Sequence, residues 1–125
     1  MTRLPEVCAG AVADYATRYI GQIVTLEIDR PLGSVHPQYP DLRYDLNYGY
    51  VPDTVAPDGE EVDAYVLGVD TPLPTFTGRC VAVICRRDDD DDKLVVVPDG
   101  VSVSDEQIRA ATRFSERDIA SIIVR

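Results

Sequence analysis

A strand-turn-strand pattern between residues 44 and 69 constrains the fold of this 125-residue chain more than any other part of its sequence. Residues 44–51 mix aromatic, β-branched and polar side chains as a half-buried strand does, and Pro52 ends the strand because it lacks a backbone N–H. In Pro57-Asp58-Gly59, the proline suits the first corner of a reverse turn and the glycine can adopt a positive φ. A second strand-like run follows at residues 62–69. The segment therefore predicts a β-hairpin.

Carboxylates crowd the turn of this predicted hairpin. Asp58, Glu60 and Asp63 follow one another closely, with Glu61 beside them. Like charges held together are unfavourable unless a cation or a proton compensates them. Oxygen ligands at short spacing suit a hard divalent ion such as Mg²⁺. A solvated acidic surface turn would have the same composition, so the cluster alone does not decide between these two interpretations.

The residues around the turn carry a resemblance to a known family. The run Asp58-Gly59-Glu60-Glu61-Val62-Asp63, preceded by Asn47-Tyr48-Gly49-Tyr50-Val51-Pro52, resembles the signature of the family I soluble inorganic pyrophosphatases, which depend on magnesium. The family motif is Asp-x-Asp-x-x-Asp, and Glu60 stands here at its middle position. The resemblance covers residues 23–98 well and the C-terminal helix weakly. It implies a mainly β fold with flanking helices, built on a small OB-like β-barrel.

Local patterns predict the remaining elements of a single domain spanning residues 1–125. An alanine-rich segment at about 5–19 predicts an amphipathic N-terminal helix. Ser104 and Gln107 have the spacing of a capping box and predict the start of a C-terminal helix. Apolar, β-branched runs predict further strands at 23–28, 78–85 and 94–97. The expected organisation is an N-terminal helix within 1–20, a barrel core at 22–98 and a C-terminal helix at 104–118.

A second acidic cluster, at residues 88–92, separates two of the predicted strands. Five consecutive aspartates are most simply a solvated loop, because their mutual repulsion prevents burial of them all. In pyrophosphatases, however, the corresponding connection carries two metal-binding aspartates, and a phosphate-binding lysine stands two residues after the second. Asp91 and Lys93 reproduce that spacing, and Asp88 matches the first aspartate. Two acidic clusters at the turns where the family needs them favour the functional interpretation.

The resemblance implies a role for each candidate residue. Glu60 would be the general base and Tyr48 would orient the site by hydrogen bonding. The metal ions, Mg²⁺, would be held by Asp58, Asp63, Asp88 and Asp91, with Glu27 acting through water. Phosphate oxygens would be held by Lys93 and Arg43, with Arg30 and His36 as further candidates.

Three departures from the family pattern bear on activity. His36 stands where the family has a phosphate-binding lysine, and an unperturbed imidazole is mostly neutral near pH 7. Asp118 and Ile119 stand where a phosphate-gripping Tyr-Lys pair ends the family's helix. Glu60 is one methylene longer than the family's aspartate, and a misplacement of about 1 Å can cost on the order of a hundredfold in rate. We therefore expect weak activity unless the backbone compensates.

The expected function is Mg²⁺-dependent hydrolysis of inorganic pyrophosphate to two phosphates by metal-activated water. One alternative is hydrolysis of an organic diphosphate, because the lost Tyr-Lys pair could open the pocket to a larger substrate. Another is a non-catalytic metal- or phosphate-binding relic of the family. The simplest alternative is an acidic structural domain without specific divalent binding.

Composition bears on partners and location. With 22 acidic and 12 basic residues the formal net charge is −10, so the chain would repel nucleic acid. No apolar run is long enough to span a membrane and no signal-peptide pattern is present. The three scattered cysteines indicate reduced thiols and a cytoplasmic location. We expect a small-molecule diphosphate as the partner and a homo-oligomer, in which the apolar tail at 119–124 pairs as an edge strand or with another subunit.

Overall fold

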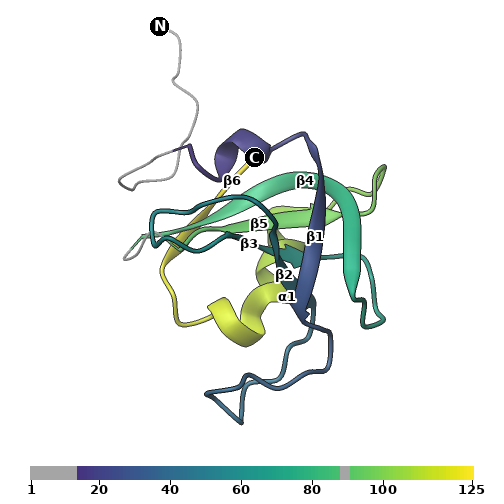
Figure 1. Ribbon diagram of the computed structural model, residues 1–125, viewed down its shortest axis with the longest axis vertical. Coiled ribbons are helices and arrows are strands. Elements are labelled where there is room, and N and C mark those ends of the chain that lie inside the picture. Colours follow the sequence, from purple (N-terminus) through teal and green to yellow (C-terminus); the bar gives the residue numbers. More distant parts are fainter. Residues whose placement is uncertain (1–13, 88–90) are drawn as a thin grey trace, which may run out of the picture.

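The structure of the protein is a computed structural model, and it describes residues 14–87 and 91–125. Figure 1 shows a barrel of strands with an α-helix on its outside. In chain order, the elements are the 3-10 helix Thr17–Tyr19, β1 (Ile23–Arg30), β2 (Asn47–Val51), β3 (Val62–Val66), β4 (Thr75–Arg86), β5 (Lys93–Val97), α1 (Asp105–Glu116) and β6 (Ser121–Val124).

Five of the strands close into a barrel. Their order is β1, β2, β3, β5, β4, and β4 pairs back to β1. All neighbouring pairs are antiparallel except β3 and β5, which run parallel. Closure pairs the strand edges that an open sheet would expose. The small, mainly β barrel predicted from the sequence is therefore confirmed.

The longest strand, β4, holds three neighbours. Its first part pairs with β1, its middle with β5 and its last residues with β6. The tail strand thus pairs within its own chain, which was one of the two possibilities expected for residues 119–124.

Residues of β5 alternate between two cores. Leu94 and Val96 belong to the cluster inside the barrel, whereas Val95 and Val97 pack with Ile108 of α1 on the outer side. Because both of its faces are covered, β5 is buried along its whole length. This double burial explains why the strand is uniformly apolar after its first residue instead of alternating with polar side chains.

Both ends of the chain were predicted to carry helices. Ser104 caps α1 by accepting the N–H of Gln107 (3.1 Å), and the side chain of Gln107 accepts the N–H of Ser104 (2.7 Å), so the predicted capping box is present. At the other end, residues 5–13 of the predicted helix lie outside the described residues. The remainder of that segment forms a turn and the short 3-10 helix instead of an α-helix.

The cysteines differ in state. Cys80 is a buried free thiol, and burial raises its pKa to about 12. Cys85 is disulfide-bonded, so the prediction that all three cysteines are reduced is wrong for this residue.

Within residues 14–87 and 91–125, no helix has the length and apolar character needed to cross a membrane.

Asn47 fixes two long loops at the start of β2. Its side chain is fully buried, and Oδ1 accepts the N–H groups of Leu32 and Leu73, both at 3.0 Å. Its Nδ2 donates to the carbonyl of Thr71 at 2.8 Å. The loop at residues 31–46, which projects from one end of the barrel in Figure 1, and the loop before β4 are therefore tied to the same side chain.

Gly49 allows β1 and β2 to approach closely. A Cβ atom at this position would overlap the carbonyl oxygen of Glu27 on β1. Glycine in the middle of the Asn-Tyr-Gly-Tyr strand is therefore required by the packing of backbone on backbone.

We predict that Gly49→Ala lowers the free energy of unfolding by about 2–3 kcal/mol, because β1 must shift to admit the methyl group. Urea denaturation followed by circular dichroism measures this change. Gly100→Ala is the control, since its Cβ would meet no atom within 4 Å and only the positive φ of 88° opposes it. Equal losses for the two variants would contradict the close approach.

Candidate active site

The loop between β2 and β3 has a defined hydrogen-bonded shape. The hydroxyl of Thr54 donates to the last carbonyl of β2 (2.6 Å) and accepts the first N–H of β3 (3.0 Å), so it bridges the strands where they separate. Within the loop, Asp58 Oδ1 accepts the N–H of Glu60 at 3.0 Å, and Gly59 adopts a φ of 86°. The turn carboxylates are therefore carried on a braced segment.

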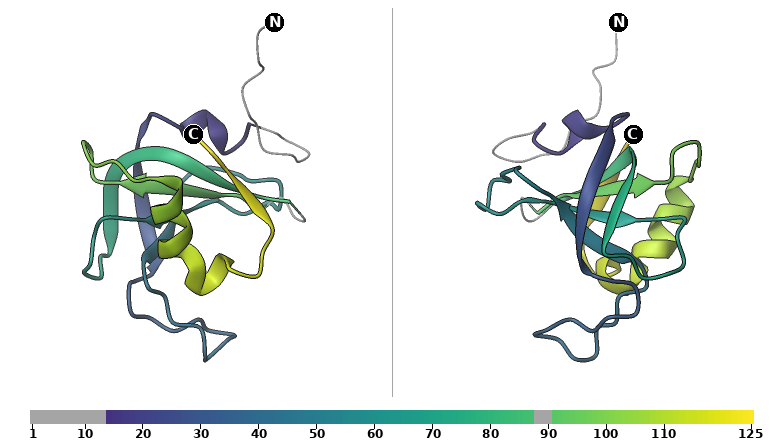
Figure 2. Two further views of the ribbon diagram at one scale, coloured as in Figure 1. Left: turned by 180° about the vertical axis from the view of Figure 1, so that it is seen from behind. Right: turned by 45° about the vertical axis from the view of Figure 1, so that its right-hand side comes forward.

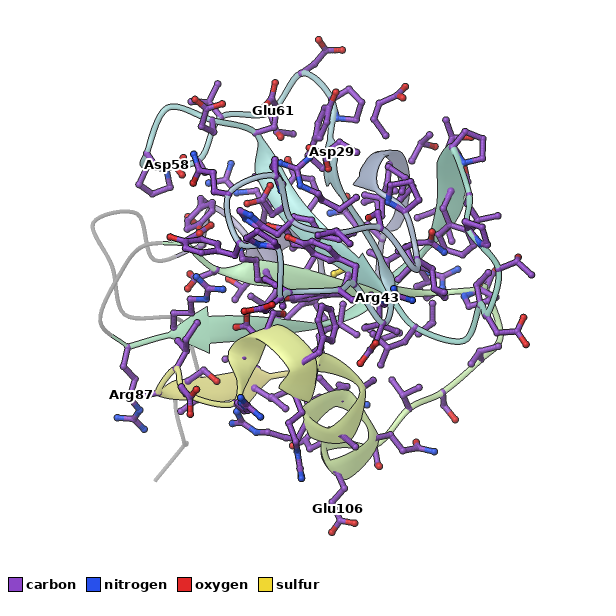
Figure 3. All side chains as sticks on the ribbon, turned by 90° about the horizontal axis from the view of Figure 1, so that it is seen from below. Asp29, Arg43, Asp58, Glu61, Arg87 and Glu106 are labelled. Atoms are coloured by element: carbon purple, nitrogen blue, oxygen red, sulfur yellow. The ribbon has the colours of Figure 1, made fainter. Side chains whose placement is uncertain are left out.

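These carboxylates line a cavity of about 350 Å³, which we call the acidic cavity. Figure 3 shows Asp29, Asp58 and Glu61 on one side of the molecule, opposite to Glu106 on α1. The side chains lining the acidic cavity are Asp29, Arg30, His36, Tyr44, Tyr48, Tyr50, Asp58, Glu60, Glu61 and Asp63. Five of them carry carboxylates, so the potential inside is strongly negative at neutral pH.

Lys93 is a buried cation that joins three other residues of the site. The parallel pairing of β3 and β5 sets it opposite Asp63. Its Nζ donates to Asp63 Oδ2 (2.9 Å), Asp91 Oδ1 (2.7 Å) and the Tyr48 hydroxyl (2.8 Å). An ammonium group has three protons to donate, and these contacts use all of them. The lysine side chain is only 3% exposed, so the ion pairs are largely shielded from solvent.

Burial and neighbouring charges have opposite effects on the pKa values of Lys93, Asp63 and Asp91. Burial raises the pKa of Asp63 and outweighs the opposing effect of Lys93. Burial would also raise the pKa of Asp91, but the cations Lys93 and Arg86 together lower it. For Lys93, burial alone would lower the pKa, whereas the two aspartates raise it above the usual value. The lysine is therefore charged at neutral pH.

A second cavity of about 410 Å³ adjoins the first, and we call it the aromatic cavity. Its lining includes Arg86, Asp91 and Lys93 together with Tyr39 and Tyr65. The two cavities share the side chains of His36, Tyr44 and Tyr48. A negatively charged compartment thus lies beside one that presents two cations and several rings.

Arg86 of β4 is held in place by Glu116 at the C-terminal end of α1. Its Nε donates to Glu116 Oε1 (3.1 Å), Nη2 donates to Glu116 Oε2, and Nη1 donates to Asp91 Oδ2 (3.4 Å). The hydroxyl of Tyr65 also donates to Glu116 Oε2 at 2.8 Å. Burial would lower the pKa of Arg86, but Glu116 raises it, so the guanidinium keeps its charge.

The rings that line the aromatic cavity contact one another. His36 lies 4.8 Å from Tyr39 and 6.3 Å from Tyr44, measured between ring centroids. Tyr44 continues the series to Tyr48 at 5.6 Å, and Phe114 of α1 packs edge-on against Tyr44 at 5.6 Å. These distances are those of favourable aromatic pairs, so α1 and the loop at 31–46 support each other through ring contacts.

Three other residues that the sequence suggested for the site are not among the described residues that line either cavity. Glu27 is exposed on β1 opposite Tyr50 and lines neither cavity. Arg43 is also exposed, pairs by a single bridge with Val35, and lines neither cavity. Asp88 lies outside the described residues. The structure thus brings Asp58, Glu60, Asp63, Tyr48, Arg30 and His36 together in the acidic cavity and Asp91 with Lys93 beside it.

The donor chemistry of the acidic cavity fits Mg²⁺. Five carboxylates line it, and a hard divalent ion prefers such oxygen ligands. In residues 14–87 and 91–125, no three side chains of His, Cys, Asp or Glu lie close enough together to hold a metal ion as they stand. One reason is visible in the structure, since Lys93 Nζ occupies the space between Asp63 and Asp91.

Some residues of the site were not singled out from the sequence. Asp29 lines the acidic cavity, and its place two residues after Glu27 on an alternating strand could have indicated a shared face. Arg86 and Glu116 had no local signal, because they are 30 residues apart and meet only through the packing of α1 on β4.

Comparisons with known proteins agree on one family. A family model described as inorganic pyrophosphatase matches residues 20–123 of this chain. The inorganic pyrophosphatase of Xylella fastidiosa is 38% identical over 85 residues, which cover 60% of this chain and 46% of that protein. That of Aquifex pyrophilus is 31% identical over 85 residues, covering 62% and 48%. This chain spans about half the length of the curated relatives it matches.

Solved structures give the same fold. The inorganic pyrophosphatase from Helicobacter pylori superposes with a TM-score of 0.61 at 21% identity, covering 82% of this chain and 84% of that one. The inorganic pyrophosphatase from Ehrlichia chaffeensis has a TM-score of 0.61 at 20% identity, with the same coverage. At such identities the likeness establishes the fold.

We predict that Lys93→Met lowers the free energy of unfolding by about 2–3 kcal/mol in metal-free buffer, because it removes the buried cation that pairs with the partly buried carboxylates of Asp63 and Asp91. Chemical denaturation with EDTA present measures the loss. The double variant Lys93→Met/Asp63→Asn should recover part of it, since one uncompensated charge is removed. Arg117→Met, which breaks the highly exposed pair with Asp118, serves as a control and should have no measurable effect. A Lys93→Met variant as stable as the control would contradict the central role of the lysine.

Proposed function

Because the chain belongs to the inorganic pyrophosphatase family, we propose that it hydrolyses inorganic pyrophosphate to two phosphate ions with the help of Mg²⁺. One observation carries the proposal: the acidic cavity adjoins the aromatic cavity, and Tyr48 belongs to the wall of both. Carboxylates that can hold a metal ion are therefore next to cations that can hold a phosphate group.

The metal would be held by carboxylates from two segments of the chain. Asp58 and Asp63 line the acidic cavity, and Asp91 reaches the same lysine as Asp63. Asp88 and Glu27 complete the proposed set. Bound Mg²⁺ supplies positive charge that offsets the charge of pyrophosphate and lowers the pKa of a water molecule. The five carboxylates that line the cavity support this assignment.

Glu60 is the proposed general base. Its side chain lines the acidic cavity, and its backbone is tied to Asp58 within the braced loop, so the carboxylate can accept a proton from water at a fixed place. Tyr48 orients the site. Burial, together with the charge of Asp63, raises the pKa of Tyr48, so its hydroxyl keeps its proton and remains a donor.

Phosphate oxygens would be bound by the cations around the two cavities. Lys93 is charged, lines the aromatic cavity and pairs with Asp63 of the acidic cavity, so it can exchange a carboxylate for a phosphate oxygen. Arg30 and His36 line the acidic cavity and are proposed as further contacts. Arg43 is retained as a proposal from the family pattern alone.

A second candidate function is hydrolysis of an organic diphosphate. The rings of His36, Tyr39 and Tyr44 line the aromatic cavity beside Lys93 and Arg86, and such a surface can pack against a planar organic group. The non-catalytic alternative, metal or phosphate binding without turnover, predicts Mg²⁺ binding in calorimetry and no phosphate release from any diphosphate.

Two further parts of the proposal concern the oligomeric state of the protein and its location in the cell. We infer that the chain acts as a homo-oligomer, because β6 ends the described sheet and can receive another strand. Light scattering tests this inference. The cytoplasm is retained as the location, with cell fractionation as its test.

We predict Mg²⁺-dependent phosphate release from pyrophosphate that EDTA abolishes. Glu60→Gln should lower kcat by about 100-fold or more, since the base is lost while the shape of the side chain is kept. Asp63→Ala should lower it at least as much. Glu106→Gln is the matched control, because Glu106 is exposed on α1 on the opposite side of the molecule (Figure 3) and should leave the rate unchanged. Turnover by wild type that persists without any divalent ion would overturn the proposed reaction.

The same assay separates the two candidate substrates. We expect pyrophosphate to have a higher kcat/KM than any nucleoside or sugar diphosphate in a panel. If one of these organic diphosphates is the better substrate, the second candidate replaces the first. In that case Tyr39→Ala should lower the kcat/KM of the organic substrate more than that of pyrophosphate.

A further inference from the structure

A third cavity, of about 390 Å³, lies between α1, β4 and β6, and we call it the α1–β6 cavity. Figure 2 shows α1 and the segment that returns from it to β6 on the outside of the barrel. The α1–β6 cavity shares no lining residue with the acidic cavity. Its apolar wall is formed by Ile84, Ile108, Ile119 and Ile123. The aliphatic wall and the volume are those of a site for a small molecule.

Three arginines line the same cavity. Arg109, Arg113 and Arg117 recur every four residues, so they follow one stripe along α1 and its C-terminal cap, and all three are exposed. Like charges at this spacing destabilise a helix unless an anion compensates them. In a chain whose net charge is −10, such a concentration of positive charge beside an apolar wall is unexpected from composition alone.

The protein compensates these charges only in part. Arg109 holds β6 by donating to the side chain of Ser121 (2.7 Å) and to its carbonyl (2.9 Å). Arg117 has a carboxylate of Asp118 at 3.6 Å, in a pair that is largely exposed and therefore weak. In the described part of the chain, the guanidinium of Arg113 makes no hydrogen bond or ion pair.

Glu116 does not supply the missing counter-charge, although it also lines the α1–β6 cavity. Its oxygens accept from Arg86 and from Tyr65 on the inner side of the helix. A carboxylate already shared with a buried guanidinium contributes little attraction toward the exposed arginines.

We propose that the α1–β6 cavity binds a small phosphate monoester. The phosphate group pairs with Arg113 and Arg117, whose guanidinium groups match phosphate oxygens in geometry and charge. The apolar part of the ligand packs on the isoleucine wall, and this requirement selects organic phosphates over inorganic phosphate.

The test is a titration of the full chain, labelled with ¹³C at isoleucine methyl groups, with n-hexyl phosphate. We expect saturable shifts at Ile84, Ile108 and Ile123, which line this cavity and neither the acidic nor the aromatic one. The methyl groups of Ile23 and Ile28 on β1 lie outside the cavity and should not move. Inorganic phosphate alone and n-hexanol alone, each carrying half of the ligand chemistry, should bind more weakly than hexyl phosphate.

Substitutions of single arginines test whether these side chains bind the phosphate group. Arg113→Gln and Arg117→Gln should each weaken hexyl phosphate binding by about tenfold, because each removes one charge-assisted contact. Arg18→Gln removes the same charge from an exposed arginine near the N-terminal end of the described chain and should leave the affinity unchanged.

Three results would overturn the proposal. The first is the absence of saturable shifts at the cavity isoleucines. The second is equal weakening by Arg18→Gln, which would indicate only a general charge effect. The third is a loss of these shifts in Lys93→Met, which would place the ligand in the aromatic cavity, whose lining shares Ile119 with the α1–β6 cavity.

Discussion

The ammonium group of Lys93 is the contact on which the site depends. It joins β3, β5 and the segment before β5 by pairing with Asp63 and Asp91, and it reaches β2 through Tyr48. Because this lysine is almost completely buried, its ion pairs hold both aspartates close to it and to each other. Any metal ion that binds these carboxylates must therefore compete with a group of the protein itself.

A second ionic contact attaches the helix to the barrel. Arg86 at the end of β4 and Glu116 at the end of α1 form a two-point pair, and Tyr65 donates to the same carboxylate. At positions 118 and 119, where the family resemblance predicts a Tyr-Lys pair, this chain has Asp118 and Ile119. Since Glu116 also lines the α1–β6 cavity and Arg86 contacts Asp91, one short chain of contacts connects that cavity with the candidate active site.

Features fixed by neighbouring residues could be predicted from the sequence, and features fixed by distant partners could not. The β2–β3 hairpin and the capping box of Ser104 depend on local turn and cap chemistry, and the structure contains both. The pairing of Lys93 with Asp63 depends on the parallel register of β3 and β5, which no local pattern specifies. The partner of β6 was open for the same reason. Cys85 was misjudged because an odd number of scattered cysteines says nothing about which of them meet.

Barrel closure has a consequence for how the chain folds. The hydroxyls of Thr25 on β1 and Thr77 on β4 lie 2.9 Å apart, although 52 residues separate them in the sequence. The β2–β3 hairpin can form early because its strands are adjacent, but the contact between β1 and β4 must wait until a long loop has closed. Until that late step, the edges of β1 and β4 remain unpaired, and this interval is when the folding chain is most exposed to association with other chains.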